Sequence, residues 1–136
     1  MSLTLRVLAP DQSVFDGPVE EVILPSTTGQ LGILKGHVSL LAALDVGVLR
    51  IRESGNWNSI ALMGGFAEVE SDDVTVLVNS AEIGSSIDAN EAAASFEKAS
   101  AAVNAMEGDP PSPEKVKATQ ALNIARARVQ ASKATA

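Results

Sequence analysis

The stretch Gly29–Leu44, GQLGILKGHVSLLAAL, brings together three glycines, the only histidine of the chain (His37) and a long apolar run. Glycines at this density are typical of a backbone that bends or takes positive φ angles. We expect the apolar run from Val38 onwards to anchor this bent segment to a core, so that a rigid scaffold presents it as a contact surface. The alternative for the same residues is a tight β-turn followed by a core strand or a 3₁₀ turn.

Composition restricts the class of protein and its compartment. A chain of 136 residues predicts one compact domain, with room for a small appendage. No apolar run approaches the ~18 residues of a membrane span, and the first ten residues lack the pattern of a signal or transit peptide. The absence of cysteine and the single histidine exclude disulfides, thiolate metal sites and histidine-based metal clusters. We therefore expect a cytosolic chain with no metal and no cofactor.

Charge is distributed unevenly along the chain. Residues 1–112 carry 16 acidic and 5 basic side chains, a net charge of −11, whereas residues 113–136 carry 1 acidic and 5 basic side chains, a net charge of +4. A basic terminal segment on an acidic body predicts an anionic partner, and the alternative is the solvated face of a helix. The segment has no aromatic residue on which bases could stack, so nucleic acid is not the expected partner.

Residues 1–84 show the pattern of short strands separated by turns. Polar and apolar residues alternate in Thr4–Val7 and Val46–Arg52, which is the period of a half-buried strand. Glu53–Asn56 is expected to form a hairpin turn, and Gly64–Gly65 to break the sheet or form a bulge. Strands with this spacing predict a β-sandwich or a barrel.

The pattern changes to helical from Ile87. Asp88 is expected to cap a first helix, with Glu91 reaching back to complete a capping box. This alanine-rich helix is expected to end near Glu107, before a glycine and two prolines, and a second helix to start at Pro113. Together they predict an antiparallel helical hairpin.

Each helix carries one apolar stripe. The stripes consist of Ala92, Phe96, Ala99, Val103 and Met106 on the first helix and Ala118, Leu122, Ala125 and Val129 on the second. Alanine favours the helix but has little side chain to bury. The helices should therefore persist while their contact is weak, which predicts a hairpin that can open without melting. The alternative is a static hairpin docked on the sandwich.

Motifs that carry catalysis are absent from the sequence. No phosphate-binding glycine loop and no nucleophile motif occurs. His37 is the one imidazole that could act as a base, and its glycine-rich surroundings favour a surface or interface role instead. The adjacent acids Glu20–Glu21 and Asp72–Asp73 do not make a carboxylate pair, because neighbours on a strand point to opposite faces. We expect a protein with no catalytic residue of its own.

Four segments in order resemble the ε subunits of rotary proton-translocating ATP synthases. They are residues 29–37, residues 61–67 (ALMGGFA), residues 74–82 (VTVLVNSAE) and Ile87–Asp88. Their wording is most similar to the cyanobacterial and plastid branch. The resemblance implies a ten-stranded β-sandwich in residues 1–86, followed by an antiparallel two-helix hairpin in residues 87–136.

The resemblance also implies a role. A member of this family is a non-catalytic subunit of the central stalk that couples proton flow to ATP synthesis and inhibits ATP hydrolysis through mobile C-terminal helices. Its partners would be the γ subunit, the membrane c-ring and, through the helices, the catalytic α/β hexamer. Such a chain would lie on the cytoplasmic or stromal side, peripheral to a thylakoid or plasma membrane and not inserted in it.

The resemblance assigns residues to these roles. The loop that contacts the rotor partners would be Gly29, Gln30, Leu31, Gly32, Ile33, Leu34, Lys35, Gly36 and His37. The inhibitory basic face would be Lys115, Lys117, Arg126 and Arg128. The family commonly has an acid in place of Gln30 and a proline in place of Lys35, so the polar contacts of this loop are expected to differ.

Some bacterial relatives bind ATP through the motif I-D-x-x-R-A. Here Glu91 replaces the arginine that would pair with phosphate, which reverses the charge. The remaining nucleotide candidates are Asp88 and Arg126, and we expect weak or no ATP binding. Two other functions are weighed against the stalk subunit: an ATP-sensing module, which Glu91 disfavours, and a β-sandwich adaptor whose hairpin binds an acidic partner outside any ATPase.

Overall fold

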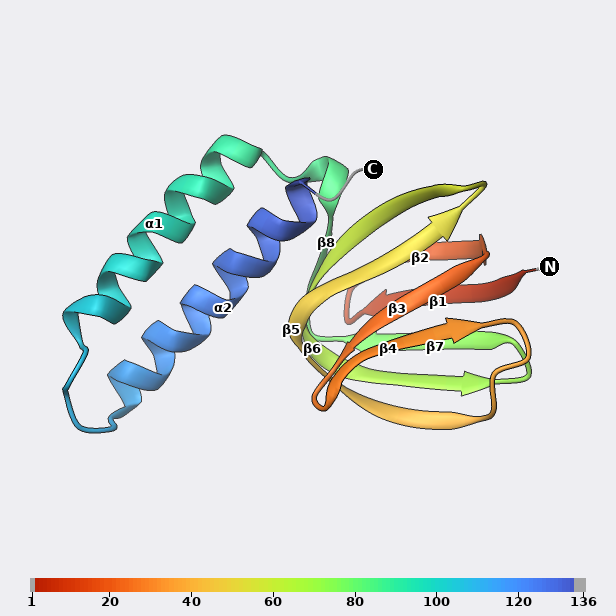
Figure 1. Ribbon diagram of the computed structural model, residues 1–136, viewed down its shortest axis with the longest axis horizontal. Coiled ribbons are helices and arrows are strands. Elements are labelled where there is room, and N and C mark those ends of the chain that lie inside the picture. Colours follow the sequence, from red (N-terminus) through yellow and green to blue (C-terminus); the bar gives the residue numbers. More distant parts are fainter. Residues whose placement is uncertain (1, 134–136) are drawn as a thin grey trace.

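The computed structural model describes residues 2–133 and contains a β-sandwich and a helical hairpin (Figure 1). The strands are β1 (Leu3–Ala9), β2 (Gln12–Val19), β3 (Glu21–Ser26), β4 (Gly29–Leu34), β5 (Leu40–Glu53), β6 (Asn56–Glu70), β7 (Asp73–Val78) and β8 (Ala81–Ile83). The 3₁₀ helix η1 (Gly84–Ser86) leads to the helices α1 (Ala89–Ala105) and α2 (Pro113–Lys133). No helix among the described residues combines the length and the apolar character needed to span a membrane.

The strands form one continuous sheet in the order β2-β1-β7-β6-β5-β3-β4, with β8 paired to β6. The sheet folds over on itself, so that two layers enclose the core (Figure 1). The expected number of ten strands is wrong, since the described residues form eight. The physical reason lies in β5 and β6, which continue through 14 and 15 residues. Their ladder is interrupted only opposite Asp45 and Gly64, where the expected break at Gly64–Gly65 is a bend within one strand.

The core of the sandwich follows the expected alternation. Leu49 and Ile51 of β5 are fully or almost fully buried, and Val74, Val76 and Val78 of β7 also face inward. The turn after β5 pairs Glu53 with Asn56 as predicted. Alternation therefore positions the inner face of the sandwich.

The expectation that the run from Val38 to Leu44 anchors a bent loop is wrong. Gly29–Leu34 is the edge strand β4, and the turn lies at Lys35–Gly36. The side chains of Val38 and Leu41 are 74% and 72% exposed, and within the run only Leu44 is buried. Because β5 begins at Leu40, successive residues alternate between the two faces of the sheet. The alternative of a turn followed by a strand describes this stretch correctly.

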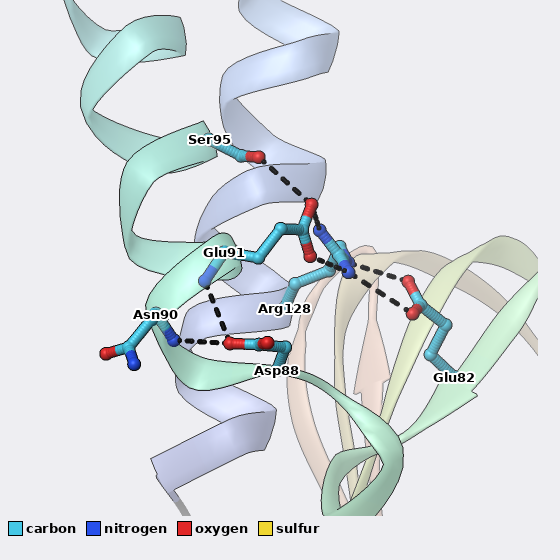
Figure 2. A network of polar contacts seen from close by, with 6 residues as sticks. All are labelled: Glu82, Asp88, Asn90, Glu91, Ser95 and Arg128. Carbon is cyan, nitrogen blue, oxygen red and sulfur yellow. Dashed lines mark hydrogen bonds and ion pairs between the residues drawn. The ribbon is translucent and has the colours of Figure 1, made fainter.

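The helix ends match the sequence with one exception. The Asp88 carboxylate accepts hydrogen bonds from the backbone N–H groups of Asn90 and Glu91, at 2.9 and 3.1 Å. The Ser112 hydroxyl caps α2 by accepting from the Lys115 N–H at 3.1 Å. The expected capping box is wrong, because the Glu91 side chain points to α2, where it meets Arg128 (Figure 2).

The hairpin docks on the outer face of the sheet through α2. Its C-terminal half packs on β5 and β6, while the turn between the helices points away from the sandwich (Figure 1). Four of the buried residues of this contact are alanines, and the fifth is an isoleucine: Ala61, Ala92, Ala127, Ala131 and Ile87. The larger residues packed against them, Val46, Val48, Met63 and Val129, are only partly buried. The large residues of the two predicted stripes, Phe96, Val103, Met106, Leu122 and Val129, are only half-buried, and Val129 packs against the cluster between hairpin and sandwich. Both contacts of the hairpin therefore bury little apolar side chain.

Candidate functional site

The turn after β4 is held by a carboxylate from another turn. Asp72 accepts a hydrogen bond from the Gly36 N–H at 2.6 Å and lies 3.4 Å from the Lys35 ammonium. The Gly36 hydrogen bond keeps the pKa of Asp72 below its ordinary value against the opposing effect of burial, and the hydrogen bond and charge of Lys35 add to this lowering. The next residue, His37, places its Nδ1 2.7 Å from the carbonyl oxygen of Val38. The end of the predicted contact loop is thus fixed against the β6–β7 turn.

The predicted contact residues do not form a single loop. Gly29, Gln30, Leu31, Gly32, Ile33 and Leu34 make up the edge strand β4, and only Lys35, Gly36 and His37 follow it. Ile33 is fully buried in the core, whereas Leu34 is 52% exposed. These residues therefore present one edge and one corner of the sandwich.

A second surface was missed by sequence reasoning. Leu8, Ala43, Phe66 and Leu77 lie side by side on neighbouring strands, because Ala43 pairs with Phe66, Phe66 with Leu77 and Leu77 with Leu8. We call these four residues the apolar row. Phe66 and Leu77 are 57% and 54% exposed, and a surface hollow is lined by them and Leu8. Alternation was the signal that could have found it, since both side chains flank buried neighbours on β6 and β7.

The four predicted basic residues do not share a face of α2. Each helical residue advances by about 100°, so residues 11 apart lie within about 20° of each other. Lys115 therefore shares a side with Arg126, and Lys117 shares nearly the opposite side with Arg128. Lys115 donates to the Asp109 carbonyl at 2.7 Å, and Arg126 donates to the side chain of Asn123 at 3.3 Å. On the docked helix the four side chains therefore point to two sides, and their inhibitory role stays a prediction.

Arg128 lies at the centre of a polar network that joins three elements (Figure 2). Its Nε donates to Glu82 of β8 at 2.7 Å, and its Nη2 donates to Glu91 of α1 at 2.9 Å. Ser95 adds a hydrogen bond to the Glu91 carboxylate at 3.3 Å. The hydrogen bonds that Arg128 donates to Glu91 and Glu82 raise the pKa of Arg128 above its already high ordinary value. No sequence signal pointed to Glu82, which is 46 residues away.

The nucleotide candidates are not brought together. The Asp88 carboxylate caps α1 (Figure 2), and Arg126 lies exposed on α2 with Asn123 as its partner. No hydrogen bond or ion pair between Asp88 and Arg126 is present in residues 2–133. The position that could face a phosphate holds Glu91, whose own partner is Arg128. Weak or absent ATP binding stays a prediction.

Comparison with known proteins identifies the family. The model of the ATP synthase delta/epsilon chain β-sandwich domain matches residues 2–84, and that of the delta/epsilon chain long α-helix domain matches residues 85–133. The chain belongs to the ATP synthase delta/epsilon chain family. The resemblance drawn from the four sequence segments is thereby confirmed.

Curated relatives in this delta/epsilon family match along nearly their full length. The ATP synthase epsilon chain of Synechococcus sp. (strain CC9902) is 77% identical over 133 residues, which covers 98% of both chains. That of Parasynechococcus marenigrum (strain WH8102) is 74% identical with the same coverage. That of Prochlorococcus marinus (strain MIT 9303) is 72% identical and is covered completely, by 98% of this chain. Synechococcus and Prochlorococcus therefore carry close relatives of this delta/epsilon family member.

Solved structures share the fold of this delta/epsilon family member. A chain in the mitochondrial ATP synthase of Euglena gracilis, solved as an OSCP/F1/c-ring assembly, superposes with a TM-score of 0.79 at 24% identity, over 96% of this chain and 81% of that one. A chain in the central stalk/c-ring structure of the Tetrahymena thermophila mitochondrial enzyme gives a TM-score of 0.63 at 18% identity, over 98% of both chains. The sandwich with its docked helices is thus an arrangement found elsewhere in solved structures.

Proposed function

We propose that the chain is a non-catalytic subunit of the central stalk of ATP synthase, which couples proton flow to ATP synthesis and restrains ATP hydrolysis. The observation that carries this proposal is a family match over both parts of the chain, the sandwich and the helical unit. Solved assemblies that share the fold contain a c-ring, which supports a place beside the γ subunit and the membrane c-ring. We place the chain on the cytoplasmic or stromal side of a thylakoid or plasma membrane, without insertion.

The two parts have different tasks in this proposal. Residues 1–86 bind the rotor, and residues 87–136 inhibit ATP hydrolysis; we call this second part the brake. Residues 134–136 of the brake lie outside the described part of the chain. The contact of the brake with the sandwich is rich in alanine, and the large side chains of the apolar stripes on α1 and α2 are only half-buried. Opening it would expose little apolar surface, so the two positions of the hairpin can lie close in free energy. Lys115, Lys117, Arg126 and Arg128 would then meet acidic segments of the α/β hexamer.

The rotor partners need an exposed apolar surface, and the sandwich has one. We assign the apolar row to the γ subunit, because four neighbouring strands present it without charge. The corner formed by Leu34, Lys35 and Val38, with Leu34 and Val38 at 52% and 74% exposure, is assigned to the c-ring. Its position at the end of β4 keeps the role that the sequence assigned to residues 29–37. Exposed apolar patches rimmed by polar residues are typical of such contacts.

Replacing Leu77 with asparagine is expected to weaken binding to a γ-containing hexamer about tenfold, which corresponds to about 1.4 kcal/mol. Leu77 is half-exposed in the free chain and would become buried on binding. The matched control is Val38→Asn, because Val38 is 74% exposed but belongs to the corner assigned to the c-ring, which the hexamer lacks. Titration by surface plasmon resonance measures both variants. Equal affinities of Leu77→Asn and the wild-type chain would show that the apolar row is not part of the interface with γ.

The proposed function is tested by ATP hydrolysis of the γ-containing hexamer. The chain is added either whole or ended after Ser86, and co-purification with the hexamer is measured for both forms. The single tryptophan, Trp57, reports whether the shortened sandwich is folded. We expect both forms to bind and only the whole chain to lower the hydrolysis rate, because the brake begins after the sandwich.

The other outcomes contradict parts of the proposal. Equal inhibition by both forms would place the brake in the sandwich and remove the role of the hairpin. Failure of both folded forms to co-purify with γ and the hexamer would favour an adaptor that acts outside ATP synthase.

A further inference from the structure

The contact between hairpin and sandwich includes one charged group shared by three elements. Arg128 donates from Nε and Nη2 to the two Glu82 oxygens, at 2.7 and 3.4 Å. It donates from Nη1 and Nη2 to the two Glu91 oxygens, at 3.3 and 2.9 Å. Figure 2 shows the guanidinium between the two carboxylates, one from β8 and one from α1. We call this group of three residues the Arg128 clasp.

The clasp is better placed than an ordinary surface ion pair. The side chain of Arg128 is 18% exposed, against 38% for Glu82 and 55% for Glu91. Isolated surface pairs contribute little, but a shielded guanidinium that reaches two carboxylates with its planar fork is the exception. The carboxylate oxygens accept the hydrogen bonds that water would otherwise accept from the guanidinium. The geometry therefore favours the docked arrangement over a separated one.

No other described ion pair involves the hairpin. Within residues 2–133 the remaining pairs, Lys35–Asp72 and Arg52 with Glu20 and Glu21, lie inside the sandwich. The rest of the described docking surface is a cluster of alanines and partly buried larger apolar residues, whose side chains have no hydrogen-bonding groups. Release of the hairpin separates Arg128 from Glu82 and leaves both charges to water. The clasp is thus the directional part of a contact that is otherwise small and apolar.

We propose that the Arg128 clasp holds the hairpin closed on the sandwich and sets how often it opens. Arg128 would then control the release of the inhibitory helices. This proposal rests on the proposed function for its meaning in the enzyme, but it concerns the isolated chain. An acidic surface on a partner competes with Glu82 and Glu91 for the same guanidinium. Such a surface stabilises the open state to the extent that it binds Arg128 better there than in the closed state.

Acid and salt should both loosen the clasp. The hydrogen bonds from Arg128 and its charge lower the pKa of Glu91 from its ordinary value of 4.5, while burial and, to a lesser extent, Asp88 act in the opposite sense. The charged groups around Glu91 are Arg128 from α2, Asp88 from its own helix, and Glu82 across the guanidinium. A depressed carboxylate pKa contributes stability above the unfolded value, which is lost as pH falls through the folded one. Opening is therefore expected below about pH 4.5, and at high salt because screening weakens exposed pairs.

The experiment measures the distance between sandwich and hairpin in the full chain. Spin labels are attached at Thr27→Cys and Ala101→Cys, both exposed positions, in a chain that has no other cysteine. Arg128→Met is expected to raise the population of long distances at least about fivefold. Arg126→Met is the matched control, because it removes the same charge two residues away from a side chain bonded only within α2.

Further variants separate the clasp from general damage. Glu82→Gln and Glu91→Gln should each open the hairpin partly, and Arg128→Lys should lie between the wild type and Arg128→Met because lysine lacks the fork. Glu91→Gln should also reduce the response to acid. Trp57 fluorescence checks that the sandwich is folded in every variant.

Two results would overturn the clasp. One is an unchanged distance distribution in Arg128→Met, and the other is equal opening in Arg126→Met. Both results come from the isolated chain and do not depend on the enzyme. If hydrolysis by the hexamer did not respond to the hairpin, the proposed function would be refuted, but the proposal about the clasp would still stand.

Discussion

Replacing Gly65 with alanine is expected to destabilise the sandwich by about 3 kcal/mol or more, the sum of backbone strain and overpacking. Gly65 has φ +153°, and a Cβ there would overlap the carbonyl oxygen of Leu77 and lie 2.8 Å from the Cα of Val78. Both neighbours are backbone atoms of the paired strand β7, which cannot rotate away. The substitution should therefore push β7 off β6 at the bend of the sandwich.

Gly64→Ala is the matched control for this prediction. Gly64 also has a positive φ, +88°, but the nearest atom to an added Cβ is 3.8 Å away. It should lose only about 1–2 kcal/mol, the cost of the left-handed backbone for an alanine. Urea denaturation followed by Trp57 fluorescence gives both free energies of unfolding. Equal losses for the two variants would show that β7 yields and that crowding at Gly65 is unimportant.

Local signals predicted the elements whose causes are local. The Asp88 cap, the start of α2 at Pro113 and the turn between Glu53 and Asn56 each depend on residues within three or four positions of one another. The strand count depends instead on whether a glycine pair ends a strand or bends it. That choice is made by the neighbouring strands, because β5 pairs with β6 on both sides of the two glycines and β7 pairs with it from Gly65 onwards. The expected ten strands came from the family resemblance, which does not show whether the strand ends or bends at this point of the chain.

Exposed apolar residues were the main source of error at the site. Between Leu40 and Leu44 both faces of β5 are apolar, so the period of two that separates inside from outside is hidden. Leu41 is 72% exposed although it lies in the run expected to form the core. A face kept apolar for a partner has the same sequence pattern as a face kept apolar for a core. Alternation could have predicted that the side chains of Phe66 and Leu77 face outward. It could not have shown that they lie next to each other in one apolar patch.

The Arg128 clasp was beyond sequence reasoning for a different reason. Glu91 was read as part of a local capping box, which accounts for its position without α2. Its true partner lies 37 residues away and the third member, Glu82, lies 46 residues from Arg128. Contacts of this kind follow from the docking of α2 on β5 and β6. The two-sided arrangement of the four basic residues was missed for a related reason, since the count of charges in residues 113–136 did not consider their angles around the helix.

Replacing Gly84 with alanine is expected to undock the hairpin while the sandwich stays folded. A Cβ at this position would overlap the carbonyl oxygen of Ala131 and lie 2.9 Å from that of Ser59. Ser59 belongs to β6, which pairs with β5, β7 and β8, whereas Ala131 lies in the last turns of α2. The more weakly held element should move, and overpacking of about 1–3 kcal/mol shifts the docking equilibrium about 5- to 150-fold.

Two reporters in the full chain distinguish the possible responses to Gly84→Ala. The Thr27–Ala101 label distance follows the hairpin, and Trp57 fluorescence follows the sandwich. We expect long distances to dominate with little change in the Trp57 melting curve. Ser85→Ala, an exposed neighbour in η1, should leave both signals unchanged. A chain that kept the short distance and melted at a lower temperature would show that β6 yields before α2, and that docking is stronger than its alanine contacts and the clasp imply.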